Sequence, residues 1–172
     1  YDPTLNRPCA RFVHAEKLIV PYNTTDLLSA QRIAQQFTIA GNDLRKLQLS
    51  GFYRDIDISP GNVVSRSDVE QEIDKLSGIG DIDYEDDVFE LYEIHTVLDL
   101  EGFEDVGEDG EQTGIKIPYI VTIDASSANV LSIRRNYNEN DPMRESIQYF
   151  VHYKFLPGLG FYGFGLPHII GG

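Results

Sequence analysis

The spacing of apolar side chains predicts two strands in the first forty residues. Residues 12–20 are rich in β-branched and aromatic types and stop at Pro21, which indicates a strand. Residues 32–39 are ambiguous: Ala30, Ile33 and Phe37 fit a helical spacing, whereas Ile33, Gln35, Phe37 and Ile39 fall on one side of a strand. Of the two, we favour the strand.

A longer alternation over residues 88–100 predicts a strand with two distinct faces. One face carries Glu90, Tyr92, Ile94, Thr96 and Leu98, and the other carries Phe89, Leu91, Glu93, His95 and Val97. Residues 117–124 and 130–137 flank the turn ASSAN and predict a hairpin. Residues 146–155 alternate again, with Ile147, Tyr149, Val151, Tyr153 and Phe155 on one side.

Helical signals are confined to the first half of the chain. Asn42 is a suitable N-cap for a short helix that would end at Gly51, with Leu44 and Leu47 facing the core. A capping box of Ser67 and Glu70 opens a second predicted helix, in which Val69, Ile73 and Leu76 share one face and Gly78 provides the stop.

These elements together predict an α+β fold. We expect an antiparallel sheet of four or more strands in a meander, with two or three short helices in the first half. Residues 1–172 would form a single module. The sequence has no initiator methionine and ends abruptly on Gly171-Gly172, so we expect an excised part of a larger subunit.

The formal charge of −14 is concentrated in one segment. Residues 65–111 hold eighteen acidic residues against Arg66 and Lys75, whereas the other residues hold twelve basic and ten acidic ones. An acidic segment cannot neutralise phosphates, which disfavours nucleic-acid binding there. No apolar run is long enough to cross a membrane.

The glycines near the end spell G-x-G-x-x-G at Gly158, Gly160 and Gly163, the spacing of a dinucleotide-binding loop. The context of that motif fails, because Pro167 interrupts the following helix and no acidic residue follows some twenty positions later. We therefore expect no cofactor.

The remaining chemical candidates are weak. DIDYEDD at 81–87 lacks the glycine and glutamate of a calcium loop, and the four histidines lack zinc spacing. Cys9 is single, so the chain has no internal disulfide. Glu93 and His95 share a strand face and would permit an acid–base pair, although a structural histidine is the more common case. We expect no metal, no catalytic residue and no enzyme.

Two consecutive arginines, Arg134 and Arg135, point to opposite faces of their predicted strand, so at most one joins any given site. A salt bridge with the acidic segment is the interpretation that we favour for them.

Five stretches of the sequence resemble the portal proteins of short-tailed bacteriophages and related prophages. The most specific are the hairpin PYIVTIDASSANVLSIRRN and the closing YKFLPGLGFYGFGLPHIIGG. The others are residues 10–27, 42–58 and 90–102, whereas residues 59–88 lie outside the resemblance.

The resemblance implies a structural role in the virion, with assembly in the host cytoplasm. Portal subunits form a ring of about twelve copies at one capsid vertex. Double-stranded DNA passes through the ring without sequence-specific binding, and the partners are the terminase motor, the capsid and the tail or adaptor proteins. This chain resembles the wing-like part of such a subunit, with no membrane contact.

Two sets of residues are our candidates for contacts with other molecules. The acidic set would meet basic patches on the next subunit, and the aromatic set would anchor the glycine-rich exit from the sheet. They are Asp81, Asp83, Asp86 and Asp87, and Phe155, Phe161, Tyr162 and Phe164. The alternative functions are a generic acidic protein–protein interaction module and, least favoured, a nucleotide-cofactor enzyme.

Overall fold

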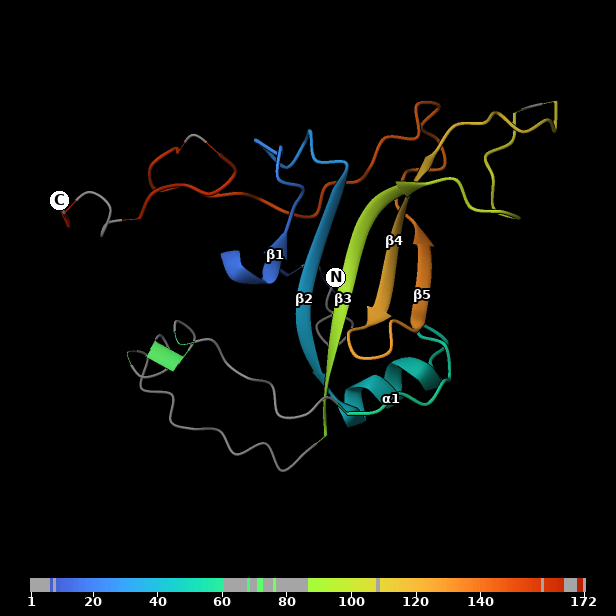
Figure 1. The fold of residues 1–172 in the computed structure, drawn as a ribbon. Helices are drawn as coiled ribbons and strands as arrows, with labels where there is room; N and C mark the ends of the chain where they lie inside the picture. The colour runs from blue at the N-terminus through green and yellow to red at the C-terminus, as the bar shows by residue number, and fades with distance from the viewer. Residues whose placement is uncertain are drawn as a thin grey trace.

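A five-stranded antiparallel sheet forms the body of the computed structural model (Figure 1). The structure describes residues 7, 9–60, 68, 71–72, 76, 87–107, 109–158, 160–165 and 170–171. The strands are β1 (Leu18–Ile19), β2 (Arg32–Ala40), β3 (Val88–Leu98), β4 (Ile117–Asp124) and β5 (Val130–Arg135). They lie in chain order, so the predicted meander is confirmed.

The register of the sheet places Gln35, Glu93, Thr122 and Ser132 in one row across β2 to β5. Ile33, His95, Ile120 and Arg134 form the next row on the same face. The two faces predicted for residues 88–98 are therefore correct, and the face with Phe89 and Leu91 is the one that the core covers.

Helix α1 (Gly41–Leu49) closes one end of this covered face. It follows β2 without a loop, and its Leu44 packs into a buried cluster with Tyr53, Phe89, Leu91 and Leu131. A bulge between Thr122 and Ile123 shifts the register of β5. A second buried cluster, Leu27, Ile33 and Phe161, lies towards β1.

The start of α1 differs from the prediction. Ala40, not Asn42, is the N-cap, and its side chain makes no capping hydrogen bond. Instead the backbone N–H of Gly41 donates to the carbonyl oxygen of Asp87 at 2.8 Å, because β3 begins beside this point. Gly51, with φ of 76°, follows the helix as predicted.

The helix count is lower than predicted in the part of the chain that the structure describes. The helical elements with described bounds are α1 and one 3-10 turn, η1 (Ala15–Lys17). The helix predicted from Ser67 to Gly78 lies outside the described residues, except for residues 68, 71, 72 and 76, which are helical.

The strand predicted at 12–20 is mostly wrong, because only Leu18 and Ile19 pair with β2 and η1 precedes them. The strand predicted at 146–155 is also wrong: this segment runs beside the body without joining a ladder. Part of the outer edge of β5 is already taken, since the N–H of Arg54 donates to the carbonyl oxygen of Leu131 at 2.8 Å. Alternation in residues 146–155 therefore reflects one covered side and not a sheet partner.

Within the described residues, no helix is long and apolar enough to span a membrane.

Candidate interaction surfaces

Residues 146–155, here called the C-terminal arm, cross the upper part of the covered face and leave on the side of β1 (Figure 1). The inward side chains anchor it. Phe150 packs on the cluster around Ile33, and its ring lies 5.0 Å from that of His95. The amide of Gln148 donates to the carbonyl oxygen of Leu27 at 3.1 Å.

The outward side of the arm is exposed. Val151 and Tyr153 are 74% and 89% exposed, and Ile147, Tyr149 and Phe155 are exposed beside them. Only one backbone–backbone hydrogen bond ties the described arm to the body, from the N–H of Ile147 to the carbonyl oxygen of Asn136 at 3.0 Å. The arm thus presents an apolar row on an extended backbone that is largely unpaired.

The chain then folds into a tight loop over residues 156–164, and the loop closes on itself. The N–H of Phe164 donates to the carbonyl oxygen of Leu156 at 2.9 Å. A Cβ on Gly163 would lie 2.5 Å from the oxygen of Leu156, and one on Gly158 would lie 2.8 Å from that of Tyr162. Two of the three glycines in the G-x-G-x-x-G spacing are therefore required by close backbone approach.

The structure divides the aromatic candidates into anchors and exposed residues. Phe161 is 6% exposed and stacks on His152 with ring centroids 4.3 Å apart. Tyr162 donates its hydroxyl to the carbonyl oxygen of Leu18 at 2.9 Å. Phe155 and Phe164 are exposed. Burial and the neighbouring charge of Lys154 lower the pKa of His152, so a neutral ring is favoured in this stack.

The acidic candidates are only partly described. Asp81, Asp83 and Asp86 lie outside the described residues. Asp87 is exposed, and its backbone carbonyl caps the start of α1 as above.

Three polar side chains, His95, Glu93 and Arg134, contact one another on the covered face. His95 Nε2 and Glu93 Oε1 are 3.0 Å apart, and Arg134 Nη2 donates to Glu93 Oε2 at 3.3 Å. Burial opposes ionisation of Glu93, but the hydrogen bond and charge of His95 and the charge of Arg134 outweigh it, so the pKa of Glu93 is lowered. The predicted salt bridge between this arginine pair and the acidic segment is confirmed for Arg134.

The same group is poorly placed for catalysis. His95 is buried beneath the arm, with the rings of Tyr149 and Phe150 5.7 and 5.0 Å away. The predicted closeness of Glu93 and His95 is real, but the rings of Tyr149 and Phe150 cover His95, and Glu93 is partly exposed. We interpret it as a structural contact that links β3, β5 and the arm.

Residues 99–107 and 109–116 belong to the acidic connection between β3 and β4, here called the acidic loop. The carboxylate of Asp105 accepts hydrogen bonds from Arg144 Nε at 3.0 Å and from the hydroxyl of Thr113 at 2.9 Å. These bonds and the charge of Arg144 lower the pKa of Asp105. The hydroxyl of Tyr119 holds the carbonyl oxygen of Phe103 at 2.8 Å.

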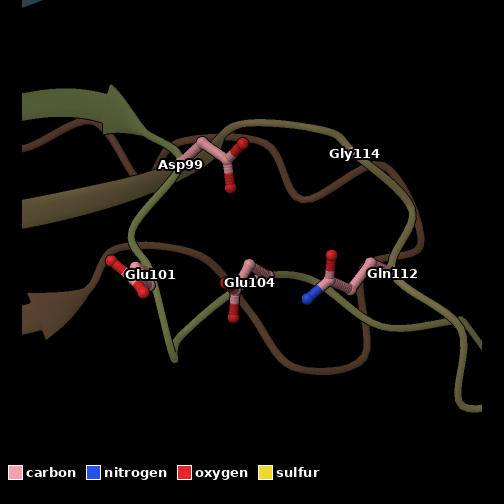
Figure 2. Close-up of a pocket in the computed structure, with 5 residues that line it drawn as sticks. All are labelled: Asp99, Glu101, Glu104, Gln112 and Gly114. Atoms are coloured by element: carbon pink, nitrogen blue, oxygen red, sulfur yellow. The ribbon is translucent and has the colours of Figure 1, made fainter.

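Figure 2 shows a shallow pocket of about 260 Å³ in this loop. Its lining residues are Asp99, Glu101, Glu104, Gln112 and Gly114. Among the described residues, no group of three or more histidine, cysteine, aspartate or glutamate side chains has the geometry to hold a metal ion. Three of the five residues that line the pocket are acidic.

Exposed apolar side chains accompany the acidic ones here. They are Phe103, Val106, Ile115 and Met143. The sequence analysis did not single out these four residues. The available signal was an apolar residue at every third position, Leu100, Phe103 and Val106, between acidic ones.

No family model matches the chain, and no curated protein and no solved structure matches it significantly.

Proposed function

We propose that this chain is the wing-like part of a phage portal subunit, and that it acts as a structural scaffold in the ring through which double-stranded DNA is packaged and ejected. The support comes from the resemblance of the hairpin at 117–137 and of the closing segment at 150–172 to portal proteins. In the structure these segments are the β4–β5 hairpin and, in its described residues, the arm with its closed loop.

One observation carries the proposal: the glycines of the closing segment act sterically. A phosphate-binding loop needs glycine so that backbone N–H groups can point at the ligand. Here Gly163 instead lets the backbone pass the carbonyl oxygen of Leu156, whose bond to Phe164 closes the loop. This favours a scaffold over a nucleotide-cofactor enzyme.

The charge of the chain supports the same role. A conduit for DNA works best when it does not grip phosphates, and −14 per copy makes a repeated assembly strongly negative. DNA would then slide past the ring without sequence-specific contacts.

Negative-stain microscopy of the full-length gene product tests the proposal. We expect the product to form rings with a central channel. We also expect its gene to lie beside terminase and capsid genes. A full-length product that forms no ring, from a gene without such neighbours, contradicts it.

The second candidate function is an acidic protein–protein interaction module. The pocket lined by Asp99, Glu101 and Glu104 favours it, because three acidic residues line one depression. A pull-down with a lysine-rich peptide distinguishes the two, since a generic module would retain it at low salt and release it at high salt.

A further inference from the structure

Two sets of exposed apolar side chains lie on different segments of the molecule. One is the outward row of the C-terminal arm, on the side of β1. The other is the patch on the acidic loop, beyond β4 and β5. The arm row used here is Tyr149, Val151, Tyr153 and Phe155, and the loop patch is Phe103, Val106, Ile115 and Met143. Clusters of exposed apolar side chains of this kind mark contact sites.

Their charges differ. Residues 99–116 contain seven acidic residues and one lysine, whereas residues 146–165 contain a single charged side chain, Lys154. Two acidic loops repel each other, so a contact between two loop patches is unfavourable. The arm carries no acidic residue, so it can approach the loop of another copy.

The arm backbone also points to a protein partner. A lipid surface would cover the apolar row but would leave the unpaired N–H and C=O groups of the extended backbone unsatisfied. The exposed carboxylates of Asp99, Glu101 and Glu111 can accept hydrogen bonds from the N–H groups of such a segment. Within one molecule the arm starts beside the acidic loop, where Arg144 contacts Asp105. Phe150 and Gln148 then hold the arm against Ile33 and Leu27, on the side of β2 and β1.

We propose that the outward row of the arm in one copy of this chain docks on the apolar patch of the acidic loop in the next copy. The contact is head-to-tail, so each copy keeps one free arm and one free loop patch. Repetition of such a contact gives a ring when the rotation closes and a filament when it does not. The inference rests on the proposed ring-forming role for its biological meaning.

The size of the two surfaces sets the expected strength. Four large exposed apolar side chains on each partner offer on the order of 400–500 Å² per side, so the contact would bury roughly 1,000 Å². That is the lower limit for a specific interface, and we expect a dissociation constant of about 10–500 μM for one contact.

Sedimentation velocity of this 172-residue chain over a range of concentrations tests the contact. We expect reversible association of the wild type. Tyr153→Glu places a carboxylate against the acidic loop, and Phe103→Glu removes an apolar anchor, so each should weaken association at least about 10-fold. Leu49→Glu changes an exposed apolar residue at the end of α1, away from both surfaces, and should associate like the wild type.

A mixture of the two defective variants separates head-to-tail contact from symmetric pairing. Tyr153→Glu keeps an intact loop patch and Phe103→Glu keeps an intact arm, so an equimolar mixture should form a one-to-one heterodimer that grows no further. Arms that paired with arms would instead leave Phe103→Glu self-associating and would exclude Tyr153→Glu. Circular dichroism confirms that both variants, which change exposed side chains, keep the fold.

Three results would overturn the proposal. The first is a wild type that stays monomeric up to about 1 mM, and the second is arm-to-arm pairing in the mixture of variants. The third is a wild type that binds neutral phospholipid vesicles and does not self-associate. These results are separate from the test of portal function. If the full-length product forms rings while the 172-residue chain stays monomeric, the portal function is supported and this contact is rejected.

Discussion

At the scale of single residues, the closing loop gives a steric meaning to a glycine spacing that elsewhere binds nucleotides. Gly158 and Gly163 lie where a Cβ would meet backbone oxygens, whereas Gly160 has open space around its Cα. Because the neighbours are backbone atoms, they cannot rotate away as a flexible side chain could. The difference between the glycines leads to a matched test.

We expect Gly163→Ala to destabilise the protein by about 1–3 kcal/mol, because the added methyl group forces the bond between Leu156 and Phe164 to open. Gly160→Ala is the control, and its stability should stay within about 0.5 kcal/mol of the wild type. Urea unfolding followed by tyrosine fluorescence measures both variants. Equal stability of the two would show that the loop does not close as described.

A second residue-scale prediction concerns Glu93, whose pKa is lowered from its ordinary value of 4.5 by His95 and Arg134 despite burial. The folded state therefore binds this proton less tightly than the unfolded chain. The resulting stability is present above about pH 4.5 and is lost as the pH falls below that value.

Glu93→Gln removes this contribution, so the variant should lose about 1–2 kcal/mol of unfolding stability at neutral pH. Its loss of stability between about pH 5 and pH 3 should be smaller than that of the wild type. Urea titrations at each pH give the comparison. If the difference in unfolding free energy between the variant and the wild type stayed the same at every pH, the pKa of Glu93 would not be lowered by folding.

At the scale of elements, the arm is held by side chains and not by a ladder. Phe150 is its apolar anchor in the cluster of Leu27, Ile33 and Phe161. Backbone segments without ladder bonds open at low cost once their anchors are removed.

We expect Phe150→Ala to release the arm while the sheet stays folded, because the sheet core lies in the other cluster around Leu91. Amide hydrogen exchange of residues 148–155 should rise by about 10-fold or more, and limited proteolysis should cut there. Val151→Ala on the outward side is the control and should leave exchange unchanged. A release in both variants would mean that the arm has no specific anchor.

The elements that could be predicted from sequence are those whose pattern and pairing agree. Residues 88–98 alternate and also lie between two partners, so both the strand and its faces were correct. Residues 146–155 alternate equally well, but alternation reports a covered side and cannot report a hydrogen-bonded partner. The N-cap of α1 was missed because the helix start depends on Asp87, which is distant in the sequence.

The candidate site was predicted in a similar way. The contact of Glu93 with His95 follows from spacing of two along one strand, which is a local property. The acidic loop patch depends on Asp105 meeting Arg144, a contact between segments 39 positions apart. No pattern within either segment encodes that meeting.

At the scale of the whole molecule, the uneven charge decides how copies can meet. The acidic segment 65–111 carries most of the negative charge, and the remainder is close to neutral. We therefore expect the acidic segment of one copy to face the nearly neutral part of the next copy.

Neutralising Asp81, Asp83, Asp86 and Asp87 to asparagine in the full-length protein tests the earlier expectation that these residues meet basic patches on the next subunit. We expect the variant to weaken ring assembly by about 10-fold, with a reduced dependence on salt, because the attraction is electrostatic. Sedimentation measures the fraction of complete rings. Complete rings at wild-type yield would exclude the acidic set from the contact.

The junction of β2, α1 and β3 has a consequence for how this chain can change in length. Ala40 pairs with Val88, and Gly41 N–H meets the Asp87 carbonyl, so everything between them departs from and returns to one corner of the sheet. Lengthening a loop that leaves and returns at such a junction costs little entropy. This corner is accordingly a natural insertion point, where relatives can differ in size and where a reporter domain can be grafted without disturbing the strands.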